Sequence, residues 1–317
     1  MFSGCSTKKV FEPKNAPKDW IKHGETNSSL KEVASDIALF EDKRVISKDI
    51  SYDIEIKKGY RLLAKSGDWI ISTTIDGKLS LNNVEKKDIT KKFDLKKTVA
   101  SASVDKNVMA VLFADNEIAL YDIDTKSILF KEMGLKASVV DSRVIPPYFM
   151  DDLVLFSTLD GKIIIVHSGL KKKLRTIIVS SQKNFNNIIY LTKFDDKIIA
   201  ATGTKLLTLS SKEIRVKYES RNIVHDEKNL YVATKQGEVL SLTSDLQLNG
   251  KIKFPFAHFL GMIPYKDKLY IVEKEGYLIV LDKNMKDYEV YNVYIEDGYI
   301  YIADKTFYIA DKFISVE

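Results

Sequence analysis

The sequence predicts an all-β protein folded as a β-propeller, with seven blades favoured and eight as the alternative. Three observations support this fold class. A pattern of two β-rich runs around a short polar turn occurs seven times along the 317 residues. Successive turns lie 29 to 45 residues apart, about 38 on average, which is the length of a four-stranded propeller blade. No long amphipathic helical pattern competes with these strands.

The repeated hairpins follow one another along the whole chain. They are DWIISTTIDGKLSL (68–81), NVMAVLFADNEIALYD (107–122), DLVLFSTLDGKIIIVH (152–167), KIIAATGTKLLTLS (197–210), NLYVATKQGEVLSLT (229–243), KLYIVEKEGYLIVLD (268–282) and GYIYIADKTFYIAD (298–311). Most of the turns contain Gly, Asn or Asp, which tolerate the positive φ that a tight hairpin needs. Such regular spacing argues against a β-sandwich, because two packed sheets have no reason to repeat one hairpin at a fixed interval.

Weaker strands flank these hairpins. Short, charged runs follow them, as in IRVKYE (214–219), and this composition is typical of outer strands that must not pair with other chains. The run SDIALFEDKRVISKD (35–49) resembles the second half of a unit. We therefore expect strands near the N-terminus to complete the sheet that the C-terminal residues begin. The final run KFISVE (312–317) resembles an outer strand of its own, which leaves an eighth, partly built blade open.

The chain is expected to divide into an N-terminal part, residues 1–31, and a propeller, residues 32–317. Residues 6–31 are polar, contain Pro13 and Pro17, and show no sustained periodicity. We expect them to form a flexible tether with a root-mean-square reach of roughly 25–30 Å.

Cys5 is the only cysteine in the chain, and it follows Phe2, Ser3 and Gly4. It cannot form an intrachain disulfide or contribute to a zinc site built of several cysteines. The run Phe-Ser-Gly-Cys resembles the end of a bacterial lipoprotein signal, which implies lipid attachment at Cys5. Because only four residues precede it, we expect the apolar part of such a signal upstream of Met1. The alternative is a chance cysteine in an N-terminal arm.

The segment LYDIDTKSILFKEM (120–133) carries a family resemblance. Its order of strand, Asp-x-x-Thr-x-x and strand resembles the repeat of the pyrroloquinoline-quinone-like propellers, a family that includes the BamB-like lipoproteins of the outer-membrane protein assembly machinery. Ser127 and Phe130 stand where that family usually has Gly and Trp. The resemblance implies a monomeric, non-catalytic scaffold that binds envelope proteins. With Ser6 rather than Asp after Cys5, it implies an outer-membrane lipoprotein that faces the periplasm.

The sequence contains no motif that predicts catalysis, a metal or a cofactor. The histidines, none at metal-binding spacing, are His23, His167, His225 and His258. Acidic residues stand in the hairpin turns at Asp76, Asp115, Asp160 and Glu275. We expect these carboxylates to accept hydrogen bonds from their own turns. A metal-dependent propeller hydrolase or oxidoreductase, with carboxylates meeting at the channel mouth, is the enzymatic alternative.

The charge pattern argues against binding to nucleic acid. The net charge is +5, with both signs interspersed along the chain. Two basic runs, residues 85–97 and 170–175, fall where outer strands are expected, so we interpret them as solvated edges. An anionic lipid surface or an acidic partner is the alternative for these runs.

Two apolar segments, RVIPPYFMDD (143–152) and KFPFAHFLGM (253–262), fall in connections between blades, which are normally polar. In a four-stranded antiparallel blade these connections share one face with the turns between the second and third strands. The residues predicted to bind a partner there are Ile145, Pro146, Pro147, Tyr148, Phe149, Phe254, Phe256 and Phe259. The alternative is that they fill the channel or pack between blades. A surface adhesin is a further functional hypothesis for such a face.

Overall fold

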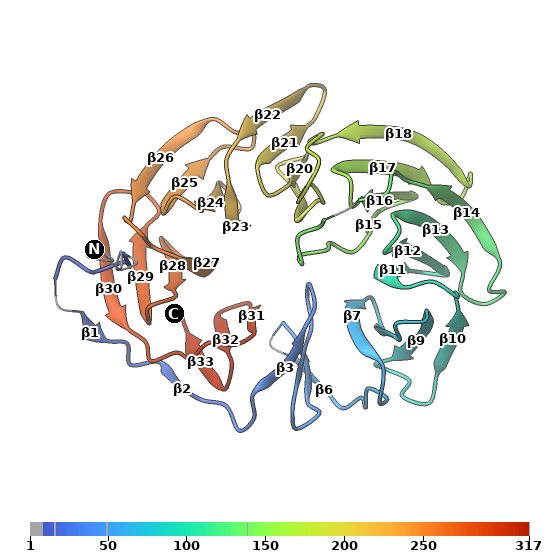
Figure 1. Cartoon of the computed structure of the whole chain (residues 1–317), viewed down its shortest axis with the longest axis horizontal. Coiled ribbons are helices and arrows are strands. Elements are labelled where there is room, and N and C mark those ends of the chain that lie inside the picture. The colour runs from blue at the N-terminus through green and yellow to red at the C-terminus, as the bar shows by residue number, and fades with distance from the viewer. Residues whose placement is uncertain (1–8, 16, 49, 138, 317) are drawn as a thin grey trace, which may run out of the picture.

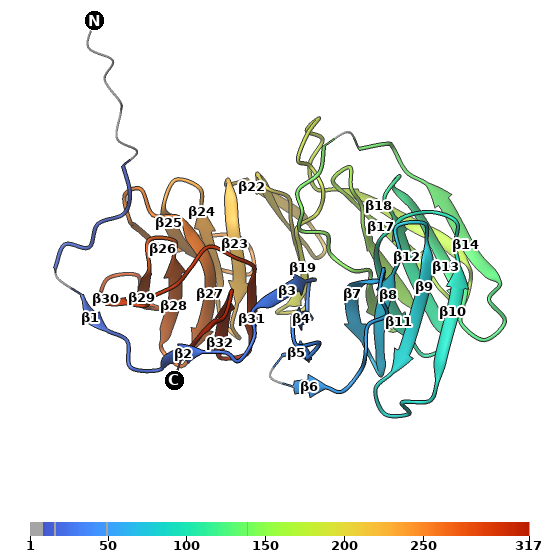
Figure 2. The ribbon, with the colours of Figure 1, turned by 60° about the horizontal axis from the view of Figure 1, so that its bottom comes forward.

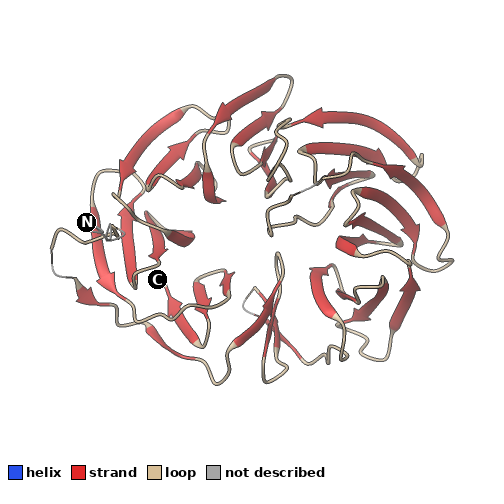
Figure 3. Cartoon of the chain, in the orientation of Figure 1, coloured by secondary structure: helices blue, strands red, loops and turns tan. Residues whose placement is uncertain are grey.

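A computed structural model describes residues 9–15, 17–48, 50–137 and 139–316 of the chain. The described residues form eight β-sheets arranged in a ring around a central channel, with no helix among them (Figures 1 and 3). The all-β propeller is therefore confirmed, but with eight blades and not the seven that the sequence favoured. No helix that could cross a lipid bilayer occurs in this described part of the chain.

Each blade is numbered here by the position of its inner strand along the chain. Blade 1 contains β3 (Leu30–Val33), β4 (Ala38–Phe40), β5 (Val45–Ser47) and β6 (Ile50–Tyr52). Blade 2 contains β7 (Arg61–Ser66), β8 (Trp69–Thr73), β9 (Lys78–Asn83) and β10 (Thr90–Asp94). Blade 3 contains β11 (Val99–Asp105), β12 (Val108–Phe113), β13 (Glu117–Asp122) and β14 (Ile128–Met133). Blade 4 contains β15 (Tyr148–Met150), β16 (Leu153–Ser157), β17 (Lys162–His167) and β18 (Lys172–Ile178).

The second half of the ring repeats the same pattern. Blade 5 contains β19 (Tyr190–Phe194), β20 (Lys197–Ala201), β21 (Lys205–Leu209) and β22 (Glu213–Lys217). Blade 6 contains β23 (Ser220–His225), β24 (Leu230–Thr234), β25 (Glu238–Leu242) and β26 (Leu248–Lys253). Blade 7 contains β27 (Phe259–Tyr265), β28 (Lys268–Glu273), β29 (Tyr277–Asp282) and β30 (Tyr288–Asn292), with β1 (Lys18–Asp19) outside β30. Blade 8 contains β31 (Ile300–Ala303), β32 (Thr306–Ile309), β33 (Lys312–Ser315) and β2 (His23–Glu25).

Both ends of the chain take part in closing the ring. The inner strand β31 of blade 8 contacts β27 on one side and β3 on the other. The fourth strand of blade 8 comes from the N-terminus, since His23 and Gly24 of β2 pair antiparallel with Ile314 and Phe313 of β33. Early residues do complete the C-terminal sheet, as expected, but the strand that does so is β2 and not part of the run 35–49.

The additional blade comes from residues 35–49, which the sequence led us to interpret as half a unit. They form β4 and β5, the middle pair of a complete blade, joined by a tight turn in which Phe40 donates its backbone N–H to the Arg44 carbonyl at 2.9 Å. Each of these strands has only three residues, so their alternation is too brief to mark a whole blade. Similarly, the turn at Asp304 and Lys305 joins the first two strands of blade 8, whereas the corresponding turns of the other repeats join the second and third.

The expected tether is wrong for residues 9–31, because these residues are packed on the propeller. Phe11 is only 5% exposed, and its ring lies edge-on to those of Phe254 and Tyr277. Trp20 donates its Nε1–H to the Ser315 carbonyl at 2.9 Å. Strand β1 runs parallel to β30 on the outside of the ring (Figures 1 and 2). The propeller thus begins well before residue 32, and Cys5 lies outside the described residues.

Charged side chains occupy the outer strands as the sequence predicted. Lys173 of β18 pairs with Glu132 of β14 at 2.6 Å, and Arg175 of β18 pairs with Glu213 of β22 at the same distance. Part of the basic run 170–175 therefore joins the rims of neighbouring blades. Exposed pairs of this kind contribute little to stability.

Candidate functional site

The links between blades and the turns between second and third strands lie on one face of the ring, which we call the turn face. Two contacts show this. Leu95 donates its backbone N–H to Gly77 at 3.0 Å, and Phe254 donates to Gly237 at 2.8 Å. Both glycines have positive φ, 89° and 77°, and a Cβ on either would lie 2.3 Å from a carbonyl of the passing link. Gly134, in the link that leads to the other apolar segment, makes the same contact with the Asn116 carbonyl at 3.0 Å, so both segments share a face with the turns, as predicted.

The three phenylalanines of the apolar segment 253–262 lie in two different environments. Phe254 and Phe259 are each 1% exposed, and their rings pack edge-on against each other. These two side chains belong to the core between the blades, which corrects their prediction as contacts on an exposed surface. Phe256 has the opposite environment: it is 57% exposed, with φ at 64°. A bulky residue rarely adopts this left-handed conformation.

The second apolar segment runs beside an inner strand of the ring. Ser101 and Ser103 of β11 donate their Oγ–H groups to the carbonyls of Ile145, at 3.2 Å, and Pro147, at 2.6 Å. Pro147 is buried, and Ile145 and Pro146 are half-buried. The predicted residues 145–147 thus pack beside the inner strand β11 of blade 3.

The last two residues of this predicted set belong to β15. Phe149 is half-buried and packs against the apolar cluster shared by blades 3 and 4, so for this residue the packing alternative holds. Tyr148 is 36% exposed and is the most accessible of residues 145–149.

Asn187, in the link between blades 4 and 5, holds the middle of the link between blades 3 and 4 at the channel mouth. This fully buried side chain accepts the Asp141 backbone N–H at 2.6 Å and donates to the Arg143 carbonyl at 2.9 Å. No local sequence pattern predicts this contact, because 46 residues separate Asn187 from Asp141. The result is a channel-mouth segment, residues 139–147, with a defined conformation.

Two arginines meet at this mouth. Arg143 makes a two-bond contact with Asp141, at 2.8 and 2.6 Å, and also donates to the backbone carbonyl of Arg221. Arg221 is half-buried and contacts the Nε2 atom of His258. Its pKa is lowered by loss of hydration first and by the positive charge of Arg143 second. In the described part of the chain, no carboxylate forms an ion pair with Arg221, and its Nε has no acceptor.

The pKa of Asp141 is set by two opposing effects, burial and hydrogen bonding. Burial opposes ionisation, but hydrogen bonds from Arg143 outweigh it and keep the pKa of Asp141 below its ordinary value. Asp141 is therefore ionised and already neutralises Arg143. Positive charge from Arg221 remains available at the mouth for a partner's carboxylate or carbonyl oxygens.

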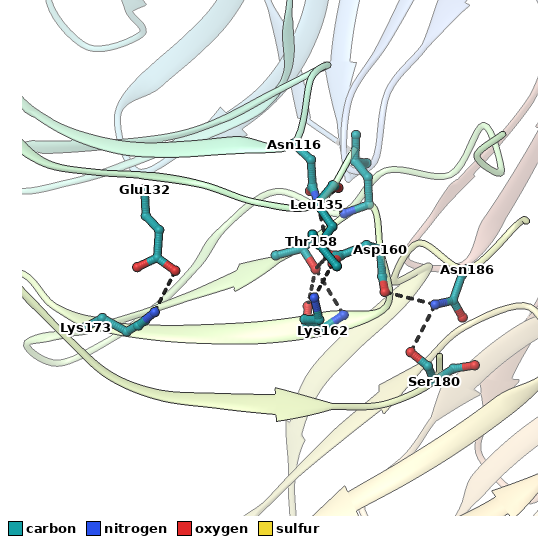
Figure 4. Close-up of polar contacts among 10 residues, drawn as sticks. Asn116, Glu132, Leu135, Thr158, Asp160, Lys162, Lys173, Ser180 and Asn186 are labelled. Carbon is teal, nitrogen blue, oxygen red and sulfur yellow. Dashed lines mark hydrogen bonds and ion pairs between the residues drawn. The ribbon is translucent and has the colours of Figure 1, made fainter. Parts of the chain in front are cut away.

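A polar network ties the turns of blades 3 and 4 to the link between blades 4 and 5 (Figure 4). Asn116 is fully buried; it donates to the Leu135 carbonyl at 2.7 Å and to Asp160 at 3.0 Å, and accepts the Leu159 N–H at 2.8 Å. Asn186 donates to the carbonyls of Asp160 and Ser180. Burial disfavours ionised Asp160, but hydrogen bonds from Lys162, Asn116 and Thr158 dominate and lower its pKa.

Replacing Asn116 with alanine is expected to lower the free energy of unfolding by about 2–4 kcal/mol, because it leaves the Leu159 N–H and the Leu135 carbonyl without these hydrogen bonds. Chemical denaturation measures the change. Asn249, an exposed residue on β26, provides the matched control, and Asn249→Ala should stay within about 0.5 kcal/mol of wild type. Equal losses in the two variants would show that the network does not hold the turns.

The hairpin carboxylates make local contacts, as predicted for Asp76, Asp115 and Asp160. Asp76 accepts a hydrogen bond from Thr74, Asp115 from the Glu117 N–H, and Asp160 from Thr158. Across the described ranges, no group of three His, Cys, Asp or Glu side chains is placed to hold a metal ion.

The comparisons with known proteins agree with a propeller fold. No known family profile matches the chain. In solved structures, BamB from Moraxella catarrhalis superimposes with a TM-score of 0.71 over 93% of this chain and 98% of that one, at 11% identity. The chain has the fold of BamB. The C-terminal WD40 domain of Sif2 also superimposes, with a TM-score of 0.66 over 96% and 100% of the two chains, at 12% identity. At these identities the likeness concerns the fold alone.

In sequence, the chain is similar to the plasminogen-binding protein PgbB of Helicobacter pylori. It is 38% identical over 197 residues to PgbB of strain J99, and 37% identical over the same length to PgbB of strain 26695. The alignment covers 61% of this chain but 36% of each relative, so the chain spans about a third of their length. The predicted BamB-like resemblance is confirmed for the fold, and the relatives in sequence are named for binding a protein.

Proposed function

We propose that the chain is a non-catalytic, membrane-anchored scaffold of the bacterial envelope that binds another envelope protein at its channel mouth. The observation that carries this proposal is the channel-mouth segment. Its residues 144–147 are apolar, Asn187 holds Asp141 and Arg143 by hydrogen bonds, and the segment lies beside Arg221, a cation with no carboxylate partner in the described residues. The residues we expect to contact the partner are Tyr148, which follows the segment, and Arg221. Tyr and Arg are enriched among the residues that dominate binding energy, and a segment fixed by hydrogen bonds loses little entropy on binding.

The anchor is Cys5, which we propose carries lipid in the outer membrane, with the propeller in the periplasm. Because residues 9–31 pack on the propeller, the length of chain that separates Cys5 from the propeller is shorter than the tether predicted from the sequence. Phe11 is fixed in the core, and Cys5 is only four residues from Lys9. Four extended residues span at most about 14 Å. The propeller then lies against the membrane, and its partner is a protein embedded in or resting on that membrane, as a component of the outer-membrane assembly machinery would be.

Recovery of the partner from cells in mild detergent tests the proposal. Wild-type protein should recover an envelope protein, and Tyr148→Ser combined with Arg221→Gln should reduce this recovery at least tenfold, since each tenfold corresponds to about 1.4 kcal/mol. Leu170→Ser is the control, because Leu170 is 66% exposed between β17 and β18, on the face opposite the turns. Equal recovery by the double variant and wild type, with both folded, would refute the channel mouth as the binding site.

The second candidate is a protein on the outer surface of the cell that binds plasminogen. The names of the relatives favour it, since the 38% identical relative is a plasminogen-binding protein. Protease added to intact cells separates the two candidates. Removal of the propeller, together with direct binding of purified plasminogen, supports the surface protein; protection of the propeller supports the periplasmic scaffold.

A further inference from the structure

A groove of about 820 Å³ runs along the outer rim between blades 6 and 7. The N-terminal segment forms one wall, with Phe11 buried at its base, and the end of β26 forms the other. Lys9, Lys14, Lys253 and Lys286 surround it, and Phe256 stands at its lip. We call these five side chains the rim surface.

The lysines of the rim surface are exposed, and none of the four forms an ion pair with another described residue. Among the described residues that line the groove, Glu12 is the only acidic one. By contrast, many other lysines of the propeller are neutralised, such as Lys268 by Asp282 and Lys283 by Asp226. The rim surface therefore carries a local excess of positive charge.

An exposed aromatic ring accompanies this charge. Phe256 is 57% exposed, its backbone holds a positive φ, and the Lys9 Nζ lies 5.4 Å from its ring centroid. A phenyl ring beside several lysines is the composition of surfaces that lie in the headgroup region of an anionic bilayer. The position of the rim surface also suits contact with a membrane, because Lys9 is only four residues from the proposed lipid attachment site at Cys5.

We propose that the rim surface docks on anionic phospholipid, so that the propeller meets the membrane at the edge between blades 6 and 7. This inference builds on the proposed lipid anchor at Cys5, which would deliver the rim surface to within about 14 Å of the bilayer. The rim lies at the outside of the ring, and the inner strands with the channel mouth lie at its centre (Figure 1). Docking at the edge leaves the mouth free for a protein partner. It assigns Phe256 to lipid, where the sequence predicted a protein contact.

Sedimentation with lipid vesicles tests the docking without the anchor. Full-length Cys5→Ser protein, which cannot be acylated, should bind vesicles of phosphatidylethanolamine and phosphatidylglycerol, and bind phosphatidylcholine vesicles at least tenfold less. Lys253→Glu with Lys286→Glu should lower the partition coefficient about tenfold or more, and Phe256→Ser several-fold. Lys171→Glu with Lys172→Glu, two exposed lysines on the opposite side of the ring, gives the same change in net charge and should leave binding unchanged.

Three results would overturn the docking: no binding to the anionic vesicles, equal binding to phosphatidylcholine, or an equal loss in the Lys171 and Lys172 control. A second readout covers any variant that fails to fold. Tryptophan placed by Phe256→Trp should shift its emission to the blue with anionic vesicles, and an unshifted spectrum would also refute docking. Neither measurement involves the protein partner or acylation, so failure here is distinct from failure of the detergent recovery.

Discussion

Deletion of residues 1–25 is expected to remove most of the stability of the propeller. The deletion takes away β2, the fourth strand of blade 8, so that β33 becomes an unprotected edge. It also removes the buried ring of Phe11 and the Trp20 hydrogen bond to Ser315. Loss of one large buried aromatic side chain alone costs about 3–5 kcal/mol, and a domain has only about 5–15 kcal/mol in total. Thermal unfolding followed by circular dichroism measures the effect.

Deletion of residues 1–8 is the matched control for this experiment. It leaves every described contact of Phe11, Trp20 and β2 in place, so its midpoint should equal that of the full chain. If the two truncated proteins unfolded at the same temperature, residues 9–25 would not form part of the folded propeller, and the sequence-based tether would be the better description.

Alanine at position 254 should destabilise the protein far more than alanine at position 256. Phe254 is enclosed by Phe11, Phe259 and Tyr288, with ring centroids 6.0, 6.1 and 5.0 Å away. Its removal leaves a cavity between blades 6 and 7, and we expect a loss of about 3–5 kcal/mol in the free energy of unfolding. Phe256 is mostly exposed, and its replacement should change the same quantity by about 0.5 kcal/mol or less.

Urea denaturation of the two variants provides this comparison, and each variant serves as the control for the other. Similar losses at both positions would contradict the assignment of Phe254 to the core and of Phe256 to the surface. The outcome also decides which phenylalanine is suitable for binding experiments, since a variant that unfolds says nothing about a binding surface.

The repeat of tight turns made the propeller predictable from sequence. Glycines such as Gly77 and Gly237 mark turns that only a residue tolerant of positive φ can form, and their spacing reports the blade. The blade count was wrong because it depended on β4 and β5, whose three-residue strands carry almost no periodic signal. The N-terminal segment was misjudged for a related reason. Its prolines and charges suggest a coil, whereas Phe11 and Trp20 are the residues that decide its position.

The candidate site was less predictable than the fold. The sequence located two unusual apolar links but not which of their aromatic rings point inward: Phe254 is buried, whereas Phe256, with φ at 64°, is exposed. The meeting of Arg143 with Arg221 joins residues 78 positions apart, and Asn187 holds a segment 46 positions away. Contacts of this kind arise from the closure of the ring and leave no local pattern in the sequence.

Photocross-linking in living cells tests the central claim, binding of an envelope protein at the channel mouth. A photoreactive amino acid at Ser142, which is exposed beside Arg143, should give one predominant adduct with an envelope protein, whereas the same group at Leu170, on the opposite face, should not. Adducts of equal yield at both positions, or none at Ser142 in cells that produce the folded protein, would contradict the claim.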